Sequence, residues 1–143
     1  MRLISTALVI AVLSCRGLCA EGLGDQHFQA GLAYERLGRY DESYTELQLA
    51  FAVDQDNAGL ALALGVVASR LGRTEVAQRA LERSIALDSD SEASYYQLAL
   101  LYENKGANDR AADAWHRFLA LSPDESLKAV AERHIQYLES HHS

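Results

Sequence analysis

A pattern of 34 residues recurs three times in this chain and constrains its fold more than any other feature. The segment Glu-Arg-Leu-Gly-Arg at residues 35–39 returns as Ser-Arg-Leu-Gly-Arg at residues 69–73, and a weaker copy follows at residues 103–107. The alignment needs no gap across three units, which are residues 24–57, 58–91 and 92–125. A fixed period of this length predicts an array of similar supersecondary units that stack on one another.

Each unit predicts two helices joined by a tight turn. In the third unit two apolar stripes at helical spacing are separated by a glycine. The stripes are Tyr95, Leu98, Ala99 and Tyr102, then Ala111, Ala114, Trp115, Phe118 and Leu119. Glycine adopts positive φ without a steric penalty, so the first helices are expected to end at Gly38, Gly72 and Gly106. The second helices are expected to have their N-caps at Asp41, Thr74 and Asn108.

The period and the residue pattern resemble the tetratricopeptide repeat over residues 24–125. The matching residues of the first two units are Gly31, Tyr34, Ser43, Leu47 and Ala50, then Leu64, Gly65, Ala77, Leu81 and Ser84. The third unit supplies Tyr95, Leu98, Ala99, Tyr102, Ala111, Trp115 and Pro123. The chain departs from the pattern at His27, Ala61 and Ala68, where aromatic residues are usual.

This resemblance implies an all-α fold, a helical-hairpin solenoid of three 34-residue repeats and a C-terminal capping helix. Small residues at Gly31, Gly65 and Ala99 are expected to let the two helices of each hairpin approach closely. Residues 126–140 are expected to form the capping helix, after a capping-box-like segment at residues 122–125. Residues 21–24 read as a short flexible linker.

Residues 1–20 have the features of an export leader. Met1 and Arg2 precede an apolar run, residues 3–13, which is too short to cross a bilayer as a helix. Two processing routes stay open. Cleavage after Ala20 would give a signal peptide, whereas residues 12–15, Val-Leu-Ser-Cys, resemble a bacterial lipobox that would make Cys15 a lipidated N-terminus. Either route predicts an exported protein, periplasmic or anchored to the bacterial envelope, with secretion as the alternative.

Charge and motifs narrow the class of function. The formal net charge of −7 disfavours nucleic acid as a partner, because phosphate backbones are bound by basic surfaces. The sequence has no metal-protease, phosphate-loop or nucleophile-elbow motif, so we expect no enzyme activity, cofactor or metal. The pairs Glu75–Arg79 and Asp113–Arg117 stand four residues apart and are expected to form ion pairs on exposed helix faces.

The resemblance also implies where a partner binds, because the first helix of each hairpin lines the concave face in this family. Helical spacing projects nine residues onto that face: Phe28, Leu32, Glu35, Leu62, Val66, Ser69, Tyr96, Leu100 and Glu103. The expected groove is apolar along its floor, with Glu35 and Glu103 at its rim. Such a strip suits a protein or peptide with an apolar segment or an amphipathic helix.

The sequence therefore predicts a non-catalytic adaptor or assembly scaffold. Chaperone-binding members of the family are distinguished by a Lys/Asn/Arg clamp for a terminal carboxylate, and the nine positions contain no such cations. Two alternatives stay open. The same strip could join two copies of this chain in a homo-oligomer, or the chain could be an accessory subunit of an envelope enzyme complex.

Overall fold

The computed structural model describes residues 22–140, and within that range the chain is helical with short turns and contains no strand. The predicted all-α, helical-hairpin solenoid class is confirmed. The chain forms two compact units that divide between Gln55 and Asp56. The expected leader, residues 1–20 with Cys15, lies outside the described residues.

The first unit is one helical hairpin. Its helices cover residues 22–36 and α2 (Tyr40–Val53). Residues 22–24, expected to belong to a linker, are instead helical. Gly24 is buried, and a Cβ atom added there would lie 3.1 Å from Cγ1 of Val53. The missing side chain thus lets the first turn of the helix pack on α2, and this tertiary contact outweighs the low helix propensity of glycine.

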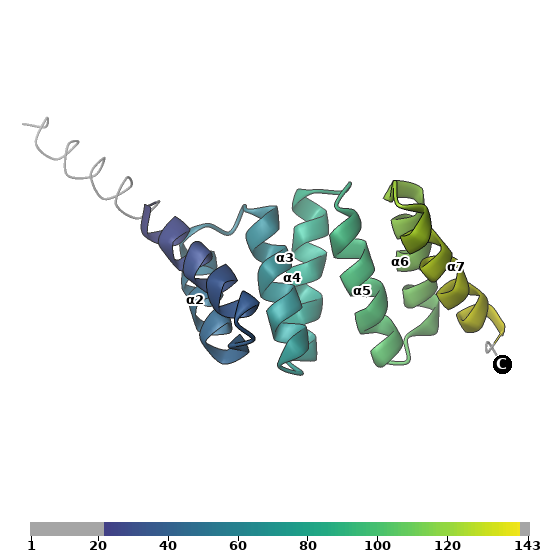
Figure 1. Cartoon of the computed structure of the whole chain (residues 1–143), viewed down its shortest axis with the longest axis horizontal. Coiled ribbons are helices and arrows are strands. Elements are labelled where there is room, and N and C mark those ends of the chain that lie inside the picture. The colour runs from purple at the N-terminus through teal and green to yellow at the C-terminus, as the bar shows by residue number, and fades with distance from the viewer. Residues whose placement is uncertain (1–21, 141–143) are drawn as a thin grey trace, which may run out of the picture. The chain divides into compact units, whose positions relative to one another are not determined.

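The second unit contains five helices, and Figure 1 shows them in sequence. They are α3 (Ala58–Arg70), α4 (Thr74–Leu87), α5 (Glu92–Asn104), α6 (Asn108–Leu121) and α7 (Glu125–Ser140). Two hairpins, α3 with α4 and α5 with α6, contact each other through α4 and α5. The capping helix α7 packs on α6.

The three hairpin turns have the same backbone geometry. Gly38, Gly72 and Gly106 have φ values of 72°, 69° and 69°, as expected for residues that end the first helices. In each turn the next residue donates its N–H to a carbonyl five residues earlier; Arg73 N, for example, donates to Ala68 O at 2.8 Å. This is the Schellman arrangement, which satisfies carbonyls that a helix end would otherwise leave unpaired.

The expected N-caps of the second helices were wrong. α2, α4 and α6 follow Arg39, Arg73 and Ala107, and none of these three N-caps makes a side-chain capping bond. The residue after each glycine already closes the preceding helix, and its carbonyl also accepts the first bond of the next one, as Arg73 O does from Ala77 N. The helices therefore begin one residue earlier than a side-chain cap at Thr74 or Asn108 requires, and two residues earlier than a cap at Asp41 requires.

Side-chain caps occur instead at helices that begin after a longer connection. Asn57 Oδ1 accepts from Leu60 N at 3.0 Å, and Ser91 caps α5 in the same way. Asp124 Oδ1 accepts from Ser126 N and Leu127 N, so α7 begins at Glu125, one residue before the expected start. The Pro123 ring accordingly lies outside the helix.

The hairpin cores bear out the expected role of small residues. A Cβ atom added to Gly31 would lie 2.7 Å from Cγ of Leu47, and one added to Gly65 would lie 2.7 Å from Cγ of Leu81. The third hairpin has Ala99 at the aligned position, where it is fully buried. Glycine or alanine at this position therefore allows the close approach of the helices.

The two expected ion pairs are absent from residues 22–140. Glu75 Oε1 instead accepts from Lys105 Nζ at 2.9 Å, which joins α4 to the end of α5. Arg117 forms no ion pair with any described residue, Asp113 included. Exposed ion pairs contribute little to stability, so neighbouring charges on a helix need not meet.

Candidate functional site

The residues selected for partner binding lie on the first helix of each hairpin. In the first unit Phe28, Leu32 and Glu35 are half-buried on the helix of residues 22–36. In the second unit three of the selected residues lie on α3 and three lie on α5, and these two helices contact each other. All six are half-buried: Leu62, Val66, Ser69, Tyr96, Leu100 and Glu103. We call these six residues the first-helix face of the second unit.

Tyr96 is the largest side chain of the first-helix face. Its ring meets Trp115 edge-on at a centroid distance of 5.3 Å and lies 5.4 Å from the Phe118 ring. Both partners are fully or almost fully buried on α6. The Tyr96 ring is therefore held by the hairpin core, while part of it stays accessible, as suits a rigid aromatic contact for a ligand.

Glu103 makes contacts that the sequence did not indicate. Its Oε1 atom accepts from Trp115 Nε1 at 2.7 Å and lies 2.8 Å from His134 Nδ1. The Trp115 and His134 rings stack with their centroids 4.8 Å apart. Glu103 thus connects α5 with α6 and α7, so it has a structural role in addition to the predicted place at the groove rim. Because His134 is 31 residues away in the chain, no local pattern signals this contact.

The capping helix continues the repeat register beyond residue 125. A shift of 34 residues places Val130, His134 and Tyr137 of α7 at the positions of Tyr96, Leu100 and Glu103. Tyr137 is 62% exposed, whereas Val130 and His134 are half-buried. Sequence reasoning treated α7 only as a cap, although the continued register was a signal that could have added Tyr137 to the candidate site.

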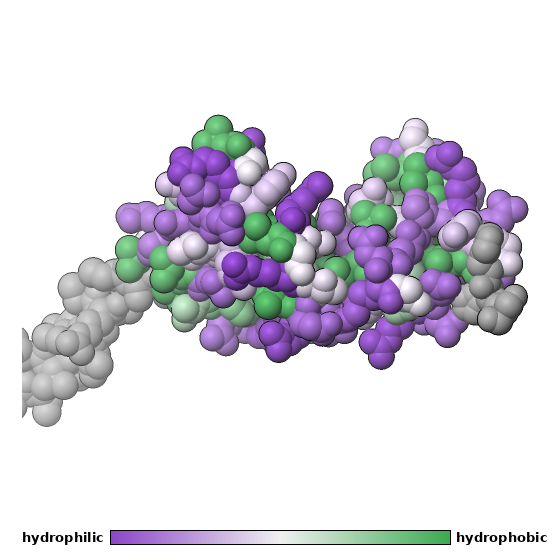
Figure 2. Space-filling model, turned by 90° about the horizontal axis from the view of Figure 1, so that it is seen from below, coloured by the Kyte–Doolittle hydropathy of each residue, from purple (hydrophilic) through white to green (hydrophobic). Residues whose placement is uncertain are grey.

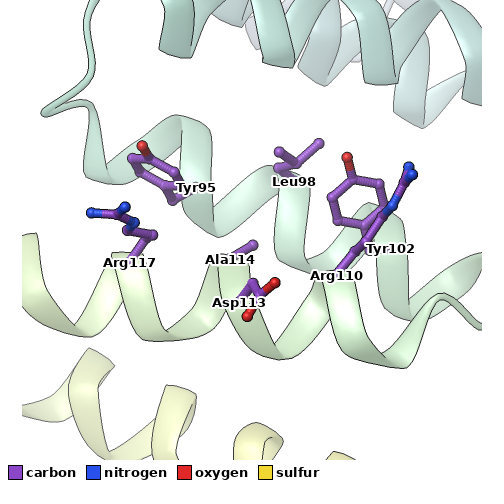
Figure 3. Close-up of a pocket in the computed structure, with 7 residues that line it drawn as sticks. All are labelled: Tyr95, Leu98, Tyr102, Arg110, Asp113, Ala114 and Arg117. Atoms are coloured by element: carbon purple, nitrogen blue, oxygen red, sulfur yellow. The ribbon is translucent and has the colours of Figure 1, made fainter.

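A pocket that sequence reasoning missed lies between α5 and α6. It has a volume of about 280 Å³ and is lined from α5 by Tyr95, Leu98 and Tyr102. From α6 it is lined by Arg110, Asp113, Ala114 and Arg117 (Figure 3). Burial raises the pKa of the Tyr102 hydroxyl, and donation of its hydrogen bond to Glu82 raises it further. The pocket therefore presents two guanidinium groups beside two tyrosine rings.

We searched residues 22–140 for a metal site and for a membrane-spanning helix. That part of the chain has no cluster of three or more His, Cys, Asp or Glu side chains suited to a metal ion. None of the helices described there has the length and apolarity needed to cross a membrane. On the face seen in Figure 2, hydrophobic residues form small separate clusters among hydrophilic ones.

Comparison with family models finds tetratricopeptide repeats along most of the chain. Two family models have that description. One matches residues 27–57 and 58–91, and the other matches residues 93–125. Among the curated proteins, none matches this sequence.

Solved structures with the same fold include several that hold a peptide. PcrH in complex with the chaperone-binding region of PopD is 21% identical, with a TM-score of 0.77 over 83% of this chain and 92% of that chain. The Yersinia enterocolitica chaperone SycD with a peptide of the translocator YopD is 14% identical, with a TM-score of 0.75 over 81% and 92%. The first repeat domain of Spaghetti (RPAP3), bound to the HSP90 peptide SRMEEVD, is 18% identical, with a TM-score of 0.75 over 84% and 93%.

Proposed function

The chain belongs to the tetratricopeptide repeat family, and we propose that it is a non-catalytic adaptor that holds a protein partner on the first helices of its hairpins. The observation that carries this proposal is the first-helix face of the second unit. Leu62, Val66, Tyr96 and Leu100 come from two neighbouring helices and all remain partly accessible. Accessible apolar side chains from adjacent helices form a typical surface for a peptide or helix of a partner.

The chemistry of this face favours an apolar segment or an amphipathic helix. None of the nine projected residues is Lys or Arg, so a ligand recognised through its terminal carboxylate would find no cation there. Tyr96 and the exposed Tyr137 offer rings that tolerate both apolar and polar neighbours. The peptide complexes of PcrH and SycD support a protein segment as ligand, because this chain shares their fold.

We also propose that the protein is exported from the cytoplasm. The leader at residues 1–20 supports action in a bacterial envelope, either as a periplasmic protein cleaved after Ala20 or as a lipoprotein anchored at Cys15. Secretion from the cell is the alternative. Mass spectrometry of the mature N-terminus distinguishes these routes, because a lipidated Cys15 carries acyl mass that a chain beginning at residue 21 lacks.

The adaptor proposal is tested by capture of the partner with the full chain, tagged at its C-terminus, from cells that export it. The test variant is Leu62→Glu/Val66→Glu, which places two carboxylates on the first-helix face. The matched control is Ala86→Glu/Ala120→Glu, which adds the same charge at exposed positions of α4 and α6. We expect one protein to be captured by the parent and the control and to be lost from the test variant.

Circular dichroism shows whether each variant is folded. If Leu62→Glu/Val66→Glu unfolds, Ser69→Glu replaces it, because Ser69 belongs to the same face and is half-buried and polar. Equal capture by all folded variants would contradict binding at this face. If the captured protein is the chain itself, and sedimentation shows a dimer that the test variant dissociates, the face joins two copies and the adaptor proposal is wrong.

A further inference from the structure

We propose that the pocket between α5 and α6 is a second docking site, which binds a partner's peptide segment carrying two carboxylates on either side of an apolar side chain. The site is independent of the first-helix face. The helical rotation of about 100° per residue puts Tyr95, Leu98 and Tyr102 roughly 150° around α5 from Tyr96 and Leu100. One ligand could therefore occupy the pocket while another lies on the first-helix face.

The lining of the pocket follows the antiparallel hairpin. Tyr95, Leu98 and Tyr102 are spaced three and four residues apart on one side of α5. Figure 3 shows Arg117 across from Tyr95 and Arg110 beside Tyr102, at the two ends of the row. The two arginines are seven positions apart on α6, which corresponds to a rise of about 10 Å. The pocket is therefore an elongated site with a cation at each end.

The two arginines are placed to accept anionic groups. Both are exposed, and Arg117 has no ion-pair partner among residues 22–140. The Arg110 guanidinium lies 5.7 Å from the centre of the Tyr102 ring, which orients it along the pocket wall. A guanidinium donates two parallel hydrogen bonds to a carboxylate, so each end suits one acidic side chain.

The middle of the pocket selects for an apolar group. Leu98 and Ala114 form its floor, and both are buried against the hairpin core. Asp113 lies between the two arginines and would repel a carboxylate at the centre. In an extended segment alternate side chains share one face and the rise is about 3.3 Å per residue, so acidic residues four positions apart, about 13 Å, can reach the two arginine side chains from the same face. The expected ligand pattern is therefore an acidic, an uncharged, an apolar, an uncharged and an acidic residue, with the apolar side chain facing the middle of the pocket.

The probe for this site is a fluorescein-labelled peptide with the core Glu-Ala-Leu-Ala-Glu, titrated with the full chain and followed by fluorescence anisotropy. The test variant is Arg110→Glu/Arg117→Glu. The matched control is Arg70→Glu/Arg133→Glu, which makes the same change in net charge at exposed arginines outside the pocket. We expect the test variant to lower the affinity at least tenfold, and the control to change it less than about twofold.

Two further titrations separate the pocket from its alternatives. A Gln-Ala-Leu-Ala-Gln peptide should bind at least tenfold more weakly to the parent chain, because it offers no carboxylate to the arginines. The Leu62→Glu/Val66→Glu variant should keep full affinity, since the first-helix face takes no part. The inference is overturned if the two double arginine variants bind equally, if the Gln peptide binds as well as the Glu peptide, or if the parent shows no binding up to about 1 mM peptide.

Discussion

Gly65 of α3 lies so close to Leu81 of α4 that a Cβ atom at position 65 would be 2.7 Å from the leucine Cγ and 2.8 Å from its Cδ2. Leu81 is fully buried, so it has little room to move away. The same relationship joins Gly31 to Leu47 in the first hairpin, 34 residues earlier. In these two hairpins the absence of a side chain on the glycine thus allows the two helices to approach closely.

Gly65→Ala should destabilise the second hairpin. The added methyl group overlaps the Leu81 side chain, and overpacking of this kind costs about 1–3 kcal/mol. Gly59→Ala is the matched control in the same helix, because a Cβ atom there meets only Asn57 Oδ1 at an ordinary 3.5 Å. Alanine at position 59 should stabilise the chain by up to about 1 kcal/mol through helix propensity.

Urea denaturation of the two variants, followed by circular dichroism, checks this prediction. The free energy of unfolding of Gly65→Ala should lie about 1–3 kcal/mol below that of Gly59→Ala. Addition of Leu81→Ala to Gly65→Ala should remove the clash, so the two changes should not be additive. Equal free energies of unfolding for Gly65→Ala and Gly59→Ala would contradict the prediction, because they would show that α3 and α4 can move apart without loss of stability.

The chain's period made the hairpins, their glycine turns and their small contact residues predictable. Each of these features depends on residues that are near one another in sequence. Because the three units share one register, a feature recognised in one unit could be placed in the other two. Gly38, Gly72 and Gly106 therefore stand where the pattern put them, with positive φ. The linker predicted at residues 21–24 was wrong for residues 22–24, which are helical, because glycine occurs both in flexible segments and where helices pack closely.

Features formed between distant residues were not predictable from spacing. Glu103 accepts hydrogen bonds from α6 and α7, and no periodic pattern shows which carboxylate will do so. The pocket beside Arg110 and Arg117 depends on how the faces of α5 and α6 meet. The second-helix caps were wrong for another reason, because the turn places Arg73 at the N-cap of α4, where it makes no side-chain capping bond, and Thr74 already lies inside the helix.

Asn57→Ala should destabilise the chain more than Thr74→Ala. Asn57 Oδ1 accepts from Leu60 N at 3.0 Å, and the loss of such a cap costs about 0.5–2 kcal/mol. Thr74 was expected to cap α4, but α4 begins after Arg73 and the Thr74 hydroxyl makes only a 3.4 Å contact with Gly72 O. Its loss should cost less than about 0.5 kcal/mol. Thermal unfolding of both variants tests this order, and a larger loss for Thr74→Ala would contradict it.

Glu103→Ala should lower the free energy of unfolding by about 1–3 kcal/mol, because it leaves the buried Trp115 N–H without its acceptor. The chain has one tryptophan, so its fluorescence reports directly on this contact. Glu139→Ala is the control, since Glu139 lies 3.8 Å from His116 with both side chains exposed. That exposed pair should contribute less than about 1 kcal/mol. Similar losses in both variants would show that Glu103 is no more than a surface charge.

Tyr102 should keep its proton at pH values where an unfolded tyrosine has lost it. Burial raises the pKa of its hydroxyl, and donation to Glu82 Oε1 at 2.9 Å acts in the same direction. The unfolded chain loses this proton near pH 10, so above that pH the folded chain holds more protons and its free energy of unfolding falls. This contribution is fully present below about pH 10 and is lost as the pH rises through the folded pKa.

Phenolate absorbance, measured as the difference between the parent and Tyr102→Phe, gives the titration of this one hydroxyl. Its midpoint should lie above about 10, and Glu82→Gln should move it downward because the charged acceptor is gone. Tyr102→Phe should also remove the matching part of the fall in stability at alkaline pH, as followed by urea denaturation. A midpoint at or below about 10 would contradict both the burial of the hydroxyl and its bond to Glu82.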